Sequence, residues 1–292
     1  MALLAIAADK GSPGVTTTAT ALAAVWPRPV LLAETDPSGG DLVYRGTAAH
    51  GGPLDPNTGL LSLAASARRG LAPQQLWQHS QRLAGGLDVL VGLAVAEQSA
   101  ALAGLWPTLG RAFRHLSESN LAGSDPAGSS GAAAAAANGA GTAAAAGCDV
   151  LADCGRLGPD SPALDLLPDA SLILLVARTE PEHLARVRDR AFALSQRLGN
   201  GPPVGVLLVV DPKHSQRLTG QVNSLLAPAG ARVMGVLAED PAGAEQLAGR
   251  RRGALGKSLL IRSARQTAAD LHQRYGAAWA GGTAQSGPGV GR

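Results

Sequence analysis

The residues that best suggest a chemical role lie in one loop near the start of the chain. An apolar run over residues 3–8 leads into Asp9-Lys10-Gly11-Ser12-Pro13-Gly14, and a predicted helix begins within Val15-Thr16-Thr17-Thr18. A strand, a glycine-containing loop and a helix start form an anion cradle, because unpaired backbone N–H groups and the helix dipole point to one spot. The same pattern also fits an ordinary tight turn between strand and helix. Taken alone, the loop leaves both interpretations open.

The elements that would position this loop alternate between short apolar runs and helical periodicity, which is typical of βαβ units on a largely parallel sheet. The predicted strands cover residues 3–8, 30–34, 87–91, 149–153, 172–177, 204–210 and 232–237. Helical patterns cover residues 16–25, 97–116, 182–198, 215–226 and 266–279, with a mixed region at 60–82. We therefore predict one doubly wound α/β domain over residues 1–280, with a mostly parallel seven-stranded sheet and helices on both faces.

Two segments differ from the rest in composition. Residues 117–147 are dominated by Ala, Gly and Ser, with almost no charge and no run of large apolar side chains, and residues 281–292 are rich in Gly and Ser. Such segments bury too little surface to offset the entropy of ordering them. We predict a disordered insertion at 117–147 and a disordered tail at 281–292, neither of which carries chemistry.

Composition bounds the class of protein. The chain has 292 residues, and 25 Lys+Arg against 22 Asp+Glu leave a formal charge of +3, which excludes a strongly basic protein that wraps nucleic acid. Lysine is scarce, with only Lys10, Lys213 and Lys257. Cys148 and Cys154 lack metal or redox spacing and are expected to be reduced and buried. With no uninterrupted apolar run of eighteen residues and no signal sequence, we expect a cytoplasmic protein without a transmembrane segment.

The loop resembles the deviant Walker A box of the ParA/MinD family of P-loop ATPases, GKGGxGKT[ST]. Further segments resemble the other landmarks of that family in the same order. They are residues 30–41 (VLLAETDPSGGD, the second strand and switch I), 148–155 (CDVLADCG, the Walker B strand and switch II), 169–182 and 233–241 (VMGVLAEDP). The resemblance covers nearly the whole chain apart from the insertion and the tail, and it implies a P-loop NTPase-like fold.

The resemblance also implies roles for individual residues. Lys10 matches the signature lysine, which reaches the phosphates of a partner subunit in a nucleotide-sandwich homodimer. Thr16 matches the Mg²⁺-binding hydroxyl, Asp36 the switch I carboxylate near the attacking water, and Asp153 the Walker B carboxylate that holds Mg²⁺ through water. A turn role for Asp36 and a metal-free strand-end role for Asp153 remain the alternatives. The residues that would cradle ATP or ADP are Gly11, Ser12, Gly14, Val15, Thr16 and Thr17.

Departures from the family pattern weaken the expected nucleotide site. Val15 occupies the position of the P-loop lysine, Asp9 replaces the first glycine, and Ser12 replaces the second glycine of the GG pair. The loop thus moves by two charge units toward repelling a triphosphate. One unit charge at a separation of about 4 Å is worth about 4 kcal/mol at an effective dielectric constant of roughly 20. We therefore expect weak binding of Mg²⁺ with ATP or ADP, and weak or absent hydrolysis.

The resemblance implies a localisation or regulatory factor that works with protein partners in cell division, chromosome partitioning, or pilus and secretion assembly. Within the family, the pattern is most similar to septum-site-determining and Tad-pilus (CpaE-like) members. Two alternatives stay open: a functional ATPase that cycles between monomer and nucleotide-bound dimer, and a structural adaptor that binds no nucleotide. Calorimetric titration with ATP and ADP, with and without Mg²⁺, would distinguish them.

Other kinds of site have weaker signals. The histidines show no HExxH spacing, and no Gly-x-Ser-x-Gly elbow is present. Glu34 ends the second predicted strand, where a dinucleotide site keeps its ribose carboxylate, yet the first loop lacks GxGxxG. A basic run near the C-terminus is a solvated face by default, with DNA or acidic lipid as the alternative contact. It consists of Arg250, Arg251, Arg252, Lys257, Arg262 and Arg265.

The end of the sequence bears on membrane targeting. Residues 281–292 have no apolar face, so a membrane helix of the MinD type is not expected there. Recruitment to the membrane or to a cell pole would then depend on a partner.

Overall fold

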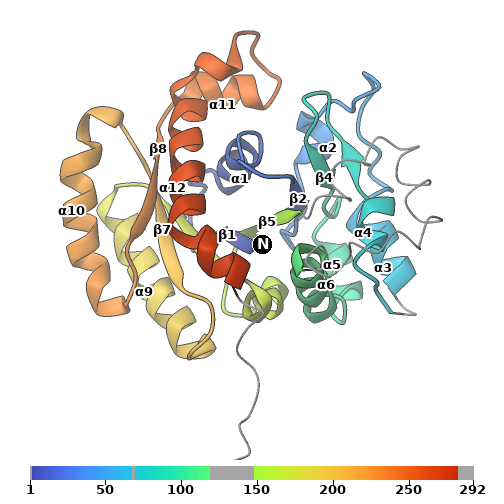
Figure 1. The fold of residues 1–292 in the computed structure, drawn as a ribbon, viewed down its shortest axis with the longest axis horizontal. Helices are drawn as coiled ribbons and strands as arrows, with labels where there is room; N and C mark the ends of the chain where they lie inside the picture. The colour runs from blue at the N-terminus through green and yellow to red at the C-terminus, as the bar shows by residue number, and fades with distance from the viewer. Residues whose placement is uncertain (1, 68–69, 119–147, 282–292) are drawn as a thin grey trace, which may run out of the picture.

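The computed structural model describes residues 2–67, 70–118 and 148–281. Its strands form one sheet in the order β3-β4-β2-β5-β1-β6-β7-β8 (Figure 1). All neighbouring strands are parallel except β3 and β4. The strands are β1 (Leu3–Ala8), β2 (Val30–Glu34), β3 (Gln81–Arg82), β4 (Asp88–Leu90), β5 (Asp149–Arg156), β6 (Leu172–Ala177), β7 (Val204–Val210) and β8 (Val233–Ala238).

Helices cover both faces of this sheet. The α-helices are α1 (Val15–Ala23), α2 (Leu42–Arg45), α3 (Leu60–Ala67), α4 (Gln75–Gln78), α5 (Glu97–Ala101), α6 (Trp106–Glu118), α9 (Pro181–Leu198), α10 (Ser215–Leu226), α11 (Pro241–Leu247) and α12 (Leu259–Gly281). Short 3₁₀ segments are η1 (Pro162–Asp169), η2 (Pro212–His214), η3 (Ala227–Ala229) and η4 (Leu255–Lys257). The helices α1, α11 and α12 pack against one another on one face, while α6 with η1 and α9 with α10 pack on the other.

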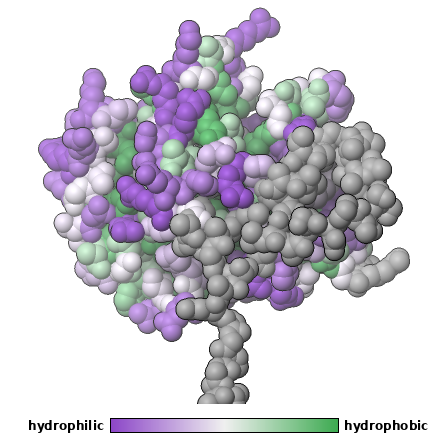
Figure 2. All heavy atoms as spheres, in the orientation of Figure 1, coloured by the Kyte–Doolittle hydropathy of each residue, from purple (hydrophilic) through white to green (hydrophobic). Residues whose placement is uncertain are grey.

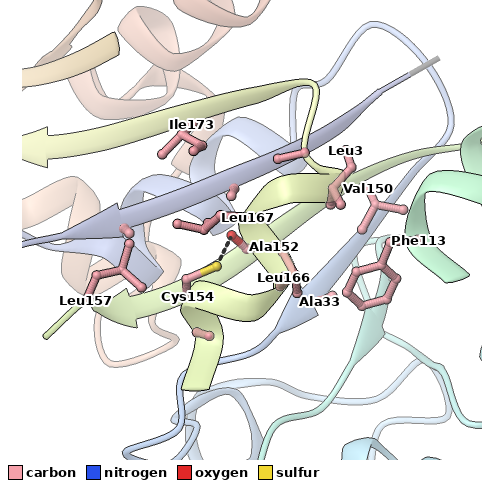
Figure 3. Packing of buried hydrophobic residues seen from close by; sticks show 14 of the residues in the cluster. Leu3, Ala33, Phe113, Val150, Ala152, Cys154, Leu157, Leu166, Leu167 and Ile173 are labelled. Atoms are coloured by element: carbon pink, nitrogen blue, oxygen red, sulfur yellow. Dashed lines mark hydrogen bonds between the residues drawn. The ribbon is translucent and has the colours of Figure 1, made fainter. Parts of the chain in front are cut away.

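The sequence explains why the central strands are buried on both faces. The strand β1 reads LLAIAA and is buried at every position, as is LILLVA of β6. Continuous apolar runs of this kind suit a parallel sheet that helices cover on both sides. Figure 3 shows one of the two resulting cores, in which Phe113 of α6 and Leu166 and Leu167 of η1 pack against side chains of β1, β2, β5 and β6.

The structure confirms the doubly wound α/β fold and adds an eighth strand to the seven that the sequence predicted. The extra strand, β3, has only two residues and pairs antiparallel with β4. The region predicted as one helical pattern over 97–116 is divided into α5 and α6, and α6 extends to Glu118, two residues into the predicted insertion. The rest of that insertion lies outside the described residues, as does the predicted tail at 281–292 except Gly281, which is the last residue of α12.

Both cysteines are free and buried, as predicted. Burial raises the pKa of the Cys154 thiol to about 12 and raises the pKa of Cys148 as well, so both stay protonated at neutral pH. The Cys154 thiol lies among the apolar side chains of the core and donates to the Ala152 carbonyl at 3.7 Å (Figure 3). Among the described helices, none is both long enough and apolar enough to cross a membrane.

Candidate functional site

The loop between β1 and α1 has the geometry of an anion cradle. Gly11 and Gly14 adopt positive φ angles of 77° and 95°, a region that side chains with a Cβ rarely enter. Gly14 is the N-cap residue of α1 and supplies no side-chain acceptor, and the first turn of the helix contains no acidic residue. The backbone N–H groups of that first turn are therefore available to an anion, and the helix dipole reinforces the attraction.

The side chain of Val15 is apolar and packs into the core, so it brings no charge to this cradle. Val15 is the first residue of α1, is only 9% exposed, and belongs to the apolar core formed with β1 and α12. The neighbouring Thr16 and Thr17 are half-buried. The position that carries the P-loop lysine in the resembling family is thus part of the hydrophobic core here.

The charge of Asp9 is neutralised from within the chain, which corrects the estimate made from the sequence. Asp9 Oδ1 lies 2.6 Å from Nε of Arg190 on α9, and both side chains are mostly buried, at 16% and 15% exposed. Because this pair balances the carboxylate, the loop departs from the family pattern by one charge unit and not by two. The ring of His183, also on α9, packs against Gly11, where an added Cβ would lie 2.9 Å from Nε2.

Lys10 lies on the surface of the loop. Its side chain is exposed and has no hydrogen-bond or ion-pair partner within the described part of the protein. Ser12 is likewise exposed. Both side chains are therefore accessible to solvent.

Parallel pairing brings the predicted carboxylates to the loop. Glu34 of β2 is in register with Asp153 of β5, which also pairs with β1, so the ends of these strands meet beside the first turn of α1. Asp153 is 1% exposed, and its Oδ1 accepts the Gly155 N–H at 3.0 Å. Its Oδ2 is buried without a hydrogen bond of ordinary geometry among the described residues. Burial raises the pKa of Asp153 to about 7, although the nearby Thr16 hydroxyl acts in the opposite direction.

Asp36 lies against the same strand end. Its Oδ1 accepts the Ser38 N–H at 2.8 Å, and its Oδ2 faces the backbone of Gly155 so closely that a Cβ there would overlap it. Burial raises the pKa of Asp36, and the proximity of Asp36 contributes to the raised pKa of Asp153. The structure thus brings Thr16, Asp36 and Asp153 together. The turn role of Asp36 is also present, in the Ser38 contact.

The arrangement of Thr16 and Asp153 fits a magnesium ion that arrives with a nucleotide. A buried carboxylate oxygen without a partner, next to a hydroxyl, is costly unless a cation or a donor satisfies it. No group of three or more His, Cys, Asp or Glu side chains in the described residues is arranged to hold a metal. Mg²⁺ commonly keeps most of its waters and takes one or two protein groups plus phosphate oxygens, so two groups suffice.

Glu34 has a role that sequence reasoning missed. Its Oε1 accepts the N–H groups of Asp41 (2.6 Å) and Leu42 (2.9 Å), and its Oε2 accepts that of Gly92 (3.0 Å). The side chain is 1% exposed and joins the loop after β2 to the loop after β4. Both carboxylate oxygens of Glu34 thus accept hydrogen bonds from the backbone of neighbouring loops, which disfavours the ribose contact of a dinucleotide site. The adjacent Gly39-Gly40 pair was the one sequence signal of this close packing.

A cavity of about 280 Å³ adjoins the cradle at the ends of β6 and β8. Pro13, Gly14 and Thr17 form one wall, and residues 237–241 form another. An ion pair between Arg178 and Glu239 connects the two strand ends at this cavity. Ligands of open α/β sheets bind at the carboxyl ends of the strands, where this cavity lies.

Comparisons with known proteins agree with this geometry. A ParA family ATPase from Chlorobium tepidum TLS superposes with a TM-score of 0.61 at 15% identity, over 92% of this chain and 98% of that one. The chain has the MinD/ParA fold. The septum site-determining protein MinD from Pyrococcus horikoshii OT3, complexed with Mg-ADP, gives 0.57 at 16% identity, over 94% and 98%. A chain of the MinC:MinD cell division protein complex from Aquifex aeolicus gives 0.57 at 15%, over 100% and 99%.

These similarities rest on structure, since neither the scan against family models nor the search of curated proteins gave a match. The MinD/ParA fold accounts for the strand order and for the position of the loop between β1 and α1. The resemblance drawn from the motifs is thereby confirmed at the level of the fold.

Proposed function

We propose that this protein is a MinD/ParA-type P-loop protein with a weakened nucleotide site, which acts as a localisation or regulatory factor. The observation that carries the proposal is the contrast within one site: the Thr16 hydroxyl lies beside the buried Asp153 carboxylate, where the two could hold a metal ion, while Val15 places an apolar side chain where the family has its lysine. Charge-assisted contacts to phosphate are about twice as strong as neutral ones, so the loss falls on phosphate binding.

The residues that remain define what the site would do. Backbone N–H groups from Gly11 to Thr17 would hold phosphate oxygens, and Thr16 with Asp153 would hold Mg²⁺, which supplies charge neutralisation when bound. Asp36 would orient water near the terminal phosphate. The exposed Lys10 would reach the phosphates of a second copy in a homodimer.

The cellular role we propose is cytoplasmic, in cell division, partitioning, or pilus and secretion assembly, with a protein partner that recruits the chain to the membrane or a pole. The similarity to a chain of the MinC:MinD complex supports a protein partner. The basic side chains at 250–265 are exposed, and Arg250 pairs with Glu245, which fits a solvated face better than a nucleic-acid site.

The proposal is tested by titrating the purified protein with ATP and ADP in a calorimeter, with and without Mg²⁺, and by measuring phosphate release. We expect weak binding that needs Mg²⁺, and a release rate no higher than that of a Thr16→Ala, Asp36→Ala variant. Tight binding with a rate that those substitutions abolish would contradict the proposal.

A working ATPase is the second candidate, and one observation favours it. Arg190 removes the charge penalty of Asp9, so backbone amides and Lys10 have only one missing positive charge to offset. The absence of any nucleotide binding, with or without Mg²⁺, would instead favour an adaptor that uses the fold alone.

A further inference from the structure

A groove runs along the outer face of α1, at the end of the sheet opposite the phosphate-binding loop. It encloses about 520 Å³ between α1, the end of α2, the β3–β4 hairpin and the segment after α11. Thr20 of α1 and Ala24, the C-cap residue of that helix, line it, and Leu83, Leu87, Leu247 and Leu255 form its apolar walls. In Figure 2, hydrophobic side chains gather between the α11 region at the top and the α2 region at the upper right.

Three guanidinium groups from different elements line this groove: Arg28 before β2, Arg45 at the end of α2, and Arg82 of β3. They are 32%, 26% and 31% exposed, so each is held partly within the protein wall. Asp88, which is 5% exposed and lies 3.4 Å from Arg82, is the one carboxylate among the lining residues.

Arg28 has donors that the protein leaves unused. Its Nε is buried and makes no hydrogen bond, although it lies 3.4 Å from Asp149 Oδ2. The Asp149 carboxylate already accepts the Ala2 N–H and the Trp26 indole N–H, both at 2.9 Å. A guanidinium has five N–H donors, and no hydrogen bond from Arg28 is made within the described residues.

Arg45 also has more N–H donors than its one ion pair occupies. It pairs with Asp41 one helical turn earlier, through one terminal nitrogen. Asp41 is 54% exposed and is not among the lining residues, so this pair leaves donors of Arg45 for the groove. Asp149 near Arg28 and Asp41 beside Arg45 thus lie outside the lining of the groove. The groove itself presents N–H donors of the two arginines above apolar walls.

We propose that this groove is a second ligand site, separate from the nucleotide site, for a small molecule with an apolar ring body and one anionic group such as a carboxylate, sulfonate or phosphate. The volume lies in the range of roughly 300–1,000 Å³ that ligand pockets occupy, and such pockets combine apolar walls with a few polar groups. Because Nε of Arg28 is buried, the anion would bind the terminal N–H donors of Arg28 and Arg45. The ring body would lie on Leu83, Leu87 and Leu247.

Site and ligand class are tested together with a matched pair of fluorescent probes. The dye 8-anilinonaphthalene-1-sulfonate carries an aromatic body with one sulfonate, and N-phenyl-1-naphthylamine has the same body without it. We expect one saturable site for the sulfonate, with at least about tenfold weaker binding of the neutral probe, because a charge-assisted bidentate contact is lost. Equal affinity of the two probes would overturn the anionic part of the proposal.

Matched variants locate the binding. Arg45→Gln should weaken the sulfonate at least about fivefold, while Arg188→Gln, which breaks an exposed pair with Asp189 on α9, should leave it unchanged. Ala24→Trp should fill the groove and abolish binding, and Ala193→Trp, at an exposed helical alanine of α9, should not. Sulfonate binding unaffected by both Arg45→Gln and Ala24→Trp would overturn the site.

A measurement on the unaltered protein keeps the test independent of how the variants fold. Sulfonate binding should shift the backbone amide resonances of Ala24, Arg45 and Leu83 in NMR spectra and leave those of Gly11 and Gly14 in place. Shifts confined to Gly11–Thr17 would place the dye in the nucleotide site and overturn the proposal.

Discussion

The two sides of the candidate nucleotide site differ in what holds their side chains in place. On the carboxylate side, Glu34, Asp36 and Asp153 are each fixed by backbone N–H groups at the ends of β2 and β5. On the loop side, Val15 packs in the apolar core and the Asp9 carboxylate forms an ion pair with Arg190. The comparison shows that glycine geometry and helix packing hold the backbone of this loop, although the loop lacks the lysine that the family motif has at position 15.

The largest effect should come from disturbing the carboxylate side. Gly155→Ala forces a Cβ onto Asp36 Oδ2 at a residue whose φ is 58°, so both sterics and backbone strain oppose it. We expect a loss of unfolding free energy of at least about 2 kcal/mol, measured by urea denaturation.

Gly158→Ala is the matched control, because a Cβ there meets nothing within 4 Å and the residue is not at positive φ. It should change the unfolding free energy by less than about 0.5 kcal/mol. Similar losses in the two variants would mean that the carboxylate side is not the rigid half of the site.

Restoring the loop side should strengthen nucleotide binding. In Ser12→Gly, Val15→Lys, the lysine stem would take the space of Val15 and extend toward the cradle with its ammonium group. We expect Mg-ATP affinity to rise by about tenfold or more, followed by fluorescence of an ATP analogue. Ser12→Gly, Val15→Met is the uncharged control and should leave the affinity near that of the unaltered protein.

This design keeps Asp9, since Asp9→Gly would leave Arg190 unpaired near the loop. A folded lysine variant that binds no better than the methionine control would show that the site is impaired on its carboxylate side too.

The sequence was sufficient for the fold, while the site residues that it suggested stay a prediction, and it was insufficient for the contacts that these residues make. Continuous apolar strands and the boxes around Lys10, Asp36 and Asp153 predicted a doubly wound sheet whose strand ends meet at the loop, and they do. Arg190 lies 181 positions from Asp9, so no local sequence pattern could predict this ion pair. The sequence indicated only that Glu34 ends a strand. The backbone N–H groups that it binds belong to two separate loops, so neighbouring residues gave no sign of this role.

The pH dependence of stability offers a second test of the carboxylate side. The pKa of Asp153 is raised from 3.8 to about 7 by burial, so between those values the folded protein binds more protons than the unfolded chain. Stability in a metal-free buffer should therefore fall as the pH rises from about 4 to about 7, by up to about 1.4 kcal/mol per pH unit.

Asp153→Asn should flatten this slope, as measured by urea denaturation in EDTA at several pH values. Because burial also raises the pKa of Glu34 and Asp36, part of the slope should persist in the variant. An equally steep slope with and without Asp153 would contradict the raised pKa and weaken the picture of an unsatisfied carboxylate awaiting a cation.

The smallest effect concerns the pair that neutralises the loop. Arg190→Gln leaves the Asp9 carboxylate, 16% exposed, without its partner beside the anion cradle. We expect Mg-ATP to bind a few-fold more weakly and the unfolding free energy to fall by about 1 kcal/mol, because a partly buried charge loses its contact.

Adding Asp9→Asn should recover most of both losses, whereas Asp9→Asn alone should leave a buried guanidinium unpaired and also destabilise. Arg188→Gln, at an exposed pair on the same helix, is the control and should do neither. A double-mutant cycle with no coupling between positions 9 and 190 would mean that Arg190 does not neutralise Asp9. The loop would then depart from the family motif by two charge units, as the sequence alone suggested.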